Sequence, residues 1–166
     1  GIVVHRLRAA LNEMASTDPL TGLANRRAFQ ALLDHELAQH LRTGRPLCVA
    51  VLDLDHFKEI NDEHGHVVGD QVLVDVAVAW TERLRKIDVL ARFGGDEFVV
   101  LFPAACATEA IEILTRMRSA SGQQFSAGIA EANGGSEVSD LLTAADKACY
   151  VAKQRGRGHV QVANAT

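Results

Sequence analysis

The sequence contains few cysteines, no excess of positive charge and no long apolar run. Its three cysteines are Cys48, Cys106 and Cys149, which are far apart, each in apolar surroundings. Such an odd, unpatterned set excludes a disulfide framework and predicts buried free thiols in a reducing compartment. No apolar run is long enough to span a membrane, and the chain has no signal-peptide pattern. We therefore expect a cytoplasmic domain that makes no direct membrane contact.

The charge balance limits the partners that the chain can bind. The 166 residues carry a net charge of −4, which excludes a general electrostatic attraction to a nucleic acid polymer. A bound nucleotide must instead be recognised by local chemistry. Hydrophobic residues make up 48% and charged residues 23% of the chain, without repeats or low-complexity tracts, and this composition is typical of one soluble domain with a real core.

The first 15 residues differ from the rest of the chain. Val4, Leu7, Leu11 and Met14 alternate three- and four-residue spacings, as in the seam of a coiled coil. Two heptads are too few to stand alone, so residues 1–15 are interpreted as the end of a longer linker helix, and residues 16–166 as the main domain. An amphipathic helix packed on its own domain fits the pattern equally well. The chain begins without Met, so we expect a piece of a longer protein, whose N-terminal region could tether the intact protein to a membrane.

The order of predicted elements indicates an α+β fold. The patterns predict a helix from a cap at Asn25 to about 42, a buried strand at 47–54, a loop through 65, a helix with its apolar face at 72–84 that ends near 86, a hairpin of 89–93 and 97–102, a helix at 107–119, a strand at 124–131, a helix at 138–155 and a short strand at 159–162. The sequence βαββαβ with a final αβ predicts a ferredoxin-like fold, with a central antiparallel or mixed sheet flanked by helices.

Two acidic segments are predicted to meet at one end of this sheet. Gly94 and Gly95 form a hairpin turn, because glycine supplies the positive φ that tight turns require, and Asp96 and Glu97 follow at once. Asp53 follows seven uncharged residues that are predicted to form a buried strand. In a split βαββαβ sheet, this strand lies beside the hairpin. Alone, Asp53 is better explained as a loop residue that caps nearby amides. Together, these oxygen ligands suit Mg²⁺, completed by phosphate oxygens and a backbone carbonyl.

Five motifs, in order, carry a resemblance to a known family. They are DPLTGLANRR at 18–27, DLDHFKEIND at 53–62, GHVVGD at 65–70, GGDEF at 94–98 and AADKACYVAKQRGR at 144–157. The chain resembles the GGDEF family of diguanylate cyclases from about residue 17 to 160. The resemblance implies a palm domain of the nucleotide cyclase type that joins two GTP molecules into cyclic di-GMP and releases two pyrophosphates. Two domains would face each other as a homodimer, each holding one GTP.

The resemblance also implies roles for the acidic residues. Asp53, the Leu54 carbonyl, Asp96 and Glu97 are similar in position to the family's ligands for Mg²⁺ or Mn²⁺, with two ions in each site. Asp96, or a metal-bound species, would help to activate the ribose 3′-hydroxyl, and Glu97 would support the metal cluster. This agrees with phosphoryl transfer, which depends on positioning and charge neutralisation.

Further positions are implied to bind GTP. Asn61 and Asp70 would recognise guanine, although each also suits a turn or a helix start. Lys153 and Arg157 would hold phosphates, although cations at a helix C-terminus are also favoured by the helix dipole. The family often has Asn after this Arg, where the chain has Gly158. The remaining assignments are backbone amides of Phe57 and Lys58, loop ordering by His66, and close ligand approach at Gly94 and Gly95.

The motif Arg85-x-x-Asp88 matches the family's inhibitory site for cyclic di-GMP, with Arg116 as a second arginine. An Arg and an Asp three residues apart are otherwise a weak surface pair. His56, His64 and His66 match no structural zinc spacing. The main alternative function is a non-catalytic module that binds GTP or cyclic di-GMP. A regulated output domain of a larger sensor is compatible with catalysis, and a polymerase-like transferase conflicts with the acidic charge.

Overall fold

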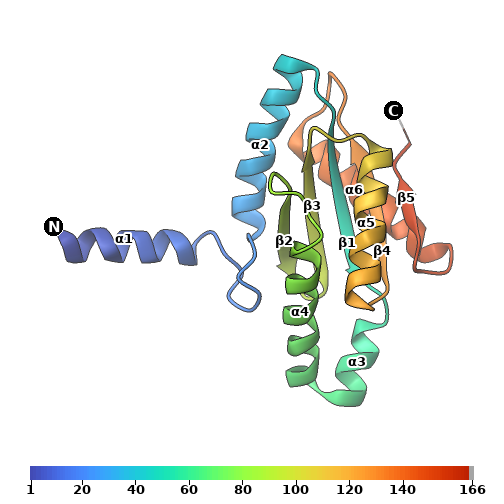
Figure 1. The fold of residues 1–166 in the computed structure, drawn as a ribbon, viewed down its shortest axis with the longest axis horizontal. Helices are drawn as coiled ribbons and strands as arrows, with labels where there is room; N and C mark the ends of the chain where they lie inside the picture. The colour runs from blue at the N-terminus through green and yellow to red at the C-terminus, as the bar shows by residue number, and fades with distance from the viewer. Residues whose placement is uncertain (165–166) are drawn as a thin grey trace.

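The computed structural model describes residues 1–164, and the side chains of all of these except residues 12–14. The described helices are α1 (Ile2–Met14), α2 (Arg26–Thr43), α3 (Phe57–His64), α4 (His66–Thr81), α5 (Ala107–Ser121) and α6 (Val138–Gln154). The described strands are β1 (Leu47–Leu54), β2 (Val89–Gly94), β3 (Glu97–Pro103), β4 (Phe125–Glu131) and β5 (Val160–Val162). Figure 1 shows that the strands form one sheet between helices.

The sheet has the split arrangement that the element order predicts. Its strand order is β2-β3-β1-β4-β5, with β1 antiparallel to both β3 and β4, and β5 parallel to β4. The first four strands are therefore those of a ferredoxin-like sheet, and β5 extends it at one edge. The register pairs Asp53 with Glu97 at one end of β1 and Leu47 with Pro103 at the other. The expected fold class is confirmed.

A hydrophobic core covers each face of the sheet. Successive residues of β1 alternate between the two cores, and the strand is buried on both sides as its apolar sequence predicts. Helices α4 and α5, in front of the sheet in Figure 1, cover one face around Trp80, whose ring makes edge contacts with Phe98 and Phe125 at 5.1 Å. Helices α2 and α6 cover the other face.

Helix boundaries follow the capping signals where these are present. The Asn25 side chain accepts a hydrogen bond from the Ala28 amide at 3.0 Å, and α2 ends at Gly44, which has a φ of 73°. Helix α6 ends with Arg155 as its C-cap, and Gly156, the expected cap, is the next residue.

Three expectations from the sequence, about α3, α4 and Cys106, were wrong. The segment expected to be a loop through residue 65 contains α3, whose buried face is small and begins at Phe57. Helix α4 begins at His66, because Gly65, with a φ of 85°, separates it from α3, and it ends at Thr81, short of the expected end near 86. Cys106 is only half-buried, since it occupies the N-cap of α5, whereas Cys48 and Cys149 are buried as expected.

Helix α1 projects from the rest of the molecule in Figure 1, with Leu7 62% exposed and Leu11 57% exposed. The alternative prediction, that this helix packs on its own domain, is therefore wrong for the described structure. The Met14 side chain, the last position of the predicted seam, lies outside the described residues. No described helix combines the length and the apolar character needed to cross a membrane.

Candidate active site

The ends of β1 and β3 bring the predicted acidic residues together. Asp53 is opposite Glu97 in the antiparallel register, and the Leu54 amide donates a hydrogen bond to the Asp96 carbonyl at 3.3 Å. Gly94 and Gly95 form the hairpin tip with φ values of 141° and 50°, and a side chain added at either would meet open space. The tip is therefore an exposed turn where a ligand can approach the backbone beside three carboxylates.

Burial, together with neighbouring negative charge, raises the pKa of two of these carboxylates. Burial, together with a hydrogen bond to Asp53 and its charge, raises the pKa of Asp96 to about 7. Burial and the nearby charge of Asp146 on α6 raise the pKa of Glu97. Lys153, also on α6, forms an ion pair with Asp53. Burial lowers the pKa of this ammonium, but the hydrogen bond to Asp53 and the negative charges around it together outweigh burial, and the net pKa is raised. The site holds more negative charge than its single paired lysine balances.

This donor set suits a hard divalent cation. The carboxylates of Asp53 and Asp96 repel each other, and this repulsion contributes to the raised pKa of Asp96. A cation bound between them would relieve the repulsion. Among the described residues, no three His, Cys, Asp or Glu side chains form a ready cluster for a metal ion. An ion held here would therefore take further oxygens from backbone, water or substrate phosphate, as Mg²⁺ commonly does.

A second feature, seven residues beyond the end of β1, is a buried polar atom without a partner among the described residues. The Oδ1 atom of Asn61 on α3 is buried, and no described group hydrogen-bonds to it. Gly69 on α4 faces it, and a Cβ at Gly69 would be 1.8 Å from that oxygen. Asp70 is the next residue and is exposed. Because a buried carbonyl oxygen without a donor is costly, this corner between α3 and α4 is suited to a ligand that supplies one.

The loop after α6 carries the predicted phosphate ligand Arg157. Residues 156–158 have φ values of 107°, 64° and 63°, so Arg157 takes a left-handed conformation between two glycines. Its side chain is exposed. The structure thus places Lys153 among the carboxylates and Arg157 on the adjacent loop.

The remaining predicted binding residues lie where α3 and α4 begin. Phe57 is buried and Lys58 exposed in the first turn of α3, whose amides are free of intrahelical partners, as at any helix start. His56 before them has a φ of 60°, which turns the chain sharply after β1. His66 is exposed and is the first residue of α4.

Sequence reasoning missed a link between the N-terminal loop and the hairpin. Asp18 accepts hydrogen bonds from the Thr21 amide at 2.9 Å and hydroxyl at 2.7 Å, and from Arg92 Nη1 at 2.9 Å. Arg92 also donates from Nε to the Gly95 carbonyl at 2.9 Å. The spacing of Asp18 and Thr21 predicts their local turn, but the pairing with Arg92, 74 residues away, carries no local signal.

The residues predicted to bind an inhibitor lie away from the carboxylates. Arg85 donates hydrogen bonds from both Nε and Nη2 to the Asp88 carboxylate. Its Nη2 also donates to the Pro103 carbonyl at 2.7 Å. The Asp88 side chain is fully buried, so this is not the weak exposed pair that the spacing alone allows. Arg116 is exposed on α5.

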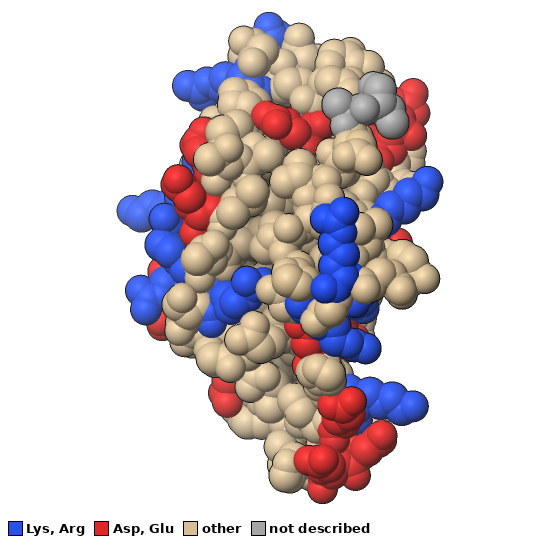
Figure 2. All heavy atoms as spheres, turned by 90° about the vertical axis from the view of Figure 1, so that its right-hand side faces the viewer, with Lys and Arg blue, Asp and Glu red and all other residues tan. Residues whose placement is uncertain are grey.

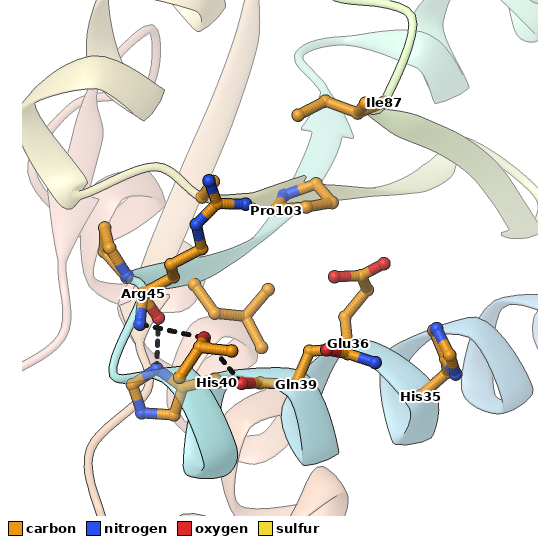
Figure 3. Close-up of a pocket in the computed structure, with 11 residues that line it drawn as sticks. His35, Glu36, Gln39, His40, Arg45, Ile87 and Pro103 are labelled. Carbon is orange, nitrogen blue, oxygen red and sulfur yellow. Dashed lines mark hydrogen bonds between the residues drawn. The ribbon is translucent and has the colours of Figure 1, made fainter.

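A pocket of about 300 Å³ lies at the far end of β1 from Asp53 (Figure 3). It is lined by Leu47 and Pro103, the pair at that end of the strand register, and by one face of α2 from His35 to Thr43. Figure 3 shows Arg45 beside His40, whose ring donates to the Arg45 carbonyl. This pocket is therefore separate from the acidic site.

Charges of both signs cover the face drawn in Figure 2. Asp and Glu gather at its lower end, the level of α3 in Figure 1, and above them Lys and Arg are interspersed with further Asp and Glu. A phosphate-bearing ligand at the acidic site would thus meet a few local cations, such as Lys153, rather than a broad positive field.

Comparisons with known proteins agree with this geometry. The family model described as "Diguanylate cyclase, GGDEF domain" matches residues 15–159. Diguanylate cyclase DgcP of Pseudomonas aeruginosa is 44% identical, over 91% of this chain and 24% of its own length. Cyclic di-GMP phosphodiesterase PdeR of Escherichia coli is 41% identical, over 92% of this chain and 25% of its own length. The chain therefore spans about a quarter of these relatives.

Solved structures show the same likeness. The crystal structure of the coiled coil and GGDEF domain of DgcB from Caulobacter crescentus, in complex with c-di-GMP, superposes with a TM-score of 0.89. It is 35% identical and covers 98% of this chain and 94% of that one. The split sheet, the acidic hairpin and these matches lead to one conclusion: the chain belongs to the GGDEF-domain family of diguanylate cyclases.

Proposed function

We propose that this domain is a diguanylate cyclase that condenses two GTP molecules into cyclic di-GMP and two pyrophosphates. The observation that carries the proposal is the meeting of Asp53, Asp96 and Glu97 at the open Gly94–Gly95 tip. No acidic residue of the set is replaced. Each 3′-hydroxyl oxygen would attack the α-phosphorus of the other GTP as the bond to pyrophosphate breaks.

Asp53, Asp96, Glu97 and the Leu54 carbonyl would hold Mg²⁺ or Mn²⁺, two ions in each site. When bound, such ions supply charge neutralisation and orientation for the phosphates. Asp96, or a metal-bound species, would help to activate the ribose 3′-hydroxyl. The raised pKa of Asp96, about 7, reflects burial and the neighbouring charge of Asp53, a repulsion that bound ions would relieve. Glu97 keeps a second negative group beside the reacting atoms.

The corner between α3 and α4 would bind guanine. A guanine edge presents N–H donors, and the unpartnered Oδ1 of Asn61 and the carboxylate of Asp70 are acceptors on neighbouring helices. The close approach of Gly69 leaves room for the Asn61 side chain in its observed position. This pairing of acceptors favours guanine as the base of the substrate.

Lys153 and Arg157 would bind the phosphates of GTP. Lys153 offers a point charge from within the acidic site, and Arg157 offers a forked donor from the following loop. The amides of Phe57 and Lys58, at the start of α3, add donors suited to an anion. His66 would help to order the α3–α4 corner at the nucleotide, and the Gly94–Gly95 backbone would allow close approach.

Catalysis would require a homodimer, because each domain supplies one GTP site. The exposed apolar side chains of Val4, Leu7 and Leu11 on α1 suit pairing with a second copy. The likeness to DgcB supports this role for α1, since the matched structure contains a coiled coil and covers nearly the whole chain. Residues 1–15 would then be the linker and residues 16–166 the catalytic domain, the output of a larger signalling protein.

Product inhibition would act through Arg85, Asp88 and Arg116. The cyclic di-GMP in the DgcB complex supports recognition of this ligand by the fold. Since Asp88 is buried against Arg85, product binding here would involve the guanidinium or rearrange the pair.

A non-catalytic binding module is the second candidate. The similarity to PdeR favours it, because a protein named for phosphodiesterase activity matches this chain about as well as a named cyclase does. Incubating the chain with GTP and Mg²⁺ and identifying products by mass separates the two. The proposal predicts cyclic di-GMP from the wild type and from Asp34→Asn, an exposed control on α2, and none from Asp96→Asn. GTP binding without turnover under dimerising conditions would favour the binding module.

A further inference from the structure

Asp55 is a buried acidic residue with no place in the site described so far. It follows β1 and is only 6% exposed. Oδ1 accepts a hydrogen bond from the Ser126 hydroxyl at 2.7 Å, and Oδ2 accepts one from the Gly158 amide at 2.8 Å. Its own amide donates to the Gln124 carbonyl at 3.0 Å. One carboxylate therefore joins the end of β1 to β4 and to the loop after α6.

The loop that Asp55 holds is an unusual piece of backbone. Residues 156–158 have three consecutive positive φ values, and the middle one is Arg157, for which a left-handed conformation is unfavourable. Such a conformation persists only where the surroundings determine it. Two backbone hydrogen bonds fix the ends of this loop. At its start the Gly156 amide donates to the Lys153 carbonyl at 3.3 Å, and after its end the His159 carbonyl accepts from the Ala127 amide at 3.0 Å. Between these anchors, the bond from Gly158 to Asp55 holds the turn.

We propose that Asp55 is a positioning residue for GTP binding: through the Gly158 amide, it holds Arg157 where that side chain meets the phosphates. The inference rests on the phosphate role proposed above for Arg157. Asp55 itself touches no substrate in this scheme. Without it, the loop samples other conformations and must be ordered when GTP binds, which weakens affinity.

The test is the affinity of the whole chain for a non-hydrolysable GTP analogue with Mg²⁺, measured by calorimetry. Asp55→Ala is expected to bind about tenfold more weakly or worse, the scale of one lost hydrogen bond to a charged group. Asp55→Asn is expected to restore most of the affinity, because its carbonyl accepts from Gly158 and its NH₂ donates to the Ser126 hydroxyl. Arg155→Ala is the matched control, since it removes a neighbouring exposed cation, the C-cap of α6, which donates to Gln161 and has no bond to Asp55.

A double-mutant cycle tests whether Asp55 acts through Arg157. If it does, Asp55→Ala adds little to the loss caused by Arg157→Ala, whereas independent additive losses would overturn the inference. Wild-type affinity in Asp55→Ala, beside a weakened Arg157→Ala, would overturn this inference alone. A wild-type chain that binds no GTP analogue would overturn the proposed function as well.

A second variant covers the case in which Asp55→Ala does not fold. Gly158→Val leaves the bond between Asp55 and Ser126 intact but disfavours the φ of 63° at position 158, and so should detach its amide from Asp55. Folding of each variant is checked by thermal denaturation. The same loss of affinity is expected in Gly158→Val, and unchanged affinity would count against the proposal.

Discussion

At the scale of single residues, Asn61 shows how a glycine can shape a binding site. Its Oδ1 atom is buried without a partner, and the space for the side chain exists only because Gly69 has no Cβ. Intrinsic helix propensity alone would favour alanine there, since glycine is a poor helix former. The glycine is therefore explained by the site and not by the stability of α4.

Gly69→Ala should displace the Asn61 amide and weaken GTP binding. A Cβ 1.8 Å from Oδ1 forces the Asn61 side chain to move. A lost hydrogen bond in a recognition site costs roughly 1–3 kcal/mol, or about 5- to 150-fold in affinity. Calorimetric titration with a GTP analogue measures it. Gln71→Ala, on the exposed side of the same helix, is the control. Equal affinities for Gly69→Ala and wild type would contradict the assignment of this corner to guanine.

Single residues also show what sequence can and cannot predict. The convergence of Asp53 with Asp96 follows from strand order, because a split sheet places β1 beside the hairpin. The burial of Asn61 depends on α3, which the sequence pattern does not predict because most of its residues are polar. The pairings of Asp18 with Arg92 and of Asp55 with Gly158 join residues far apart in the chain and depend on loops without hydrophobic periodicity, so no pattern predicts them.

At the scale of elements, Asp18 and Arg92 connect the loop before α2 to the hairpin tip. Burial alone would raise the pKa of Asp18, but hydrogen bonds from Thr21 and the charge of Arg92 outweigh it and lower the pKa below its ordinary value of 3.8. A carboxylate with a lowered pKa stabilises the folded state above its unfolded pKa, and this contribution is lost as the pH falls through the folded pKa.

Asp18→Asn should therefore lower the free energy of unfolding by about 1–3 kcal/mol near neutral pH. The difference from wild type should shrink once the pH falls below the ordinary value of 3.8, where the wild-type carboxyl is also protonated. Urea unfolding over a series of pH values measures this, with Asp34→Asn as an exposed control. A difference that stays constant across the acid range would show that the charge of Asp18 is not what stabilises the loop.

The contact between β4 and α6 fixes the position of Lys153. At Gly128 the helix backbone comes so close that an added Cβ would be 2.1 Å from the Ala145 carbonyl oxygen and 2.2 Å from the Cys149 nitrogen. Backbone atoms cannot move aside as flexible side chains do. Because α6 carries Lys153 close to its C-terminal end, this packing positions the site as well as the core.

Gly128→Ala should destabilise the domain by about 1–3 kcal/mol or more, the usual cost of overpacking. It should also weaken GTP binding, since α6 must shift away from the sheet. Gly134→Ala, in the loop between β4 and α6 where an added Cβ meets open space, is the matched control. Chemical unfolding and calorimetry give the two readouts. Wild-type stability in Gly128→Ala would mean that the close approach is absent in solution.

At the scale of the whole molecule, the proposed reaction needs two copies of the groups that one domain carries. One acidic hairpin, one base corner and one phosphate loop suit one GTP, whereas the proposed product joins two. Helix α1 leaves its apolar side chains exposed instead of covering the domain, as a dimerising helix would. Strand order and fold class were predictable from the sequence, but the direction of α1 was not, because the same spacing serves a coiled coil or a packed helix.

The most direct test of this account is the initial rate of cyclic di-GMP formation from GTP and Mg²⁺ over a wide range of protein concentrations. If two half-sites must meet, the rate will rise faster than linearly with protein until the dimer is saturated, and Asp96→Asn will form no product. A rate strictly proportional to protein from the lowest concentrations, in chains shown by sedimentation to be monomeric, would contradict the half-site mechanism.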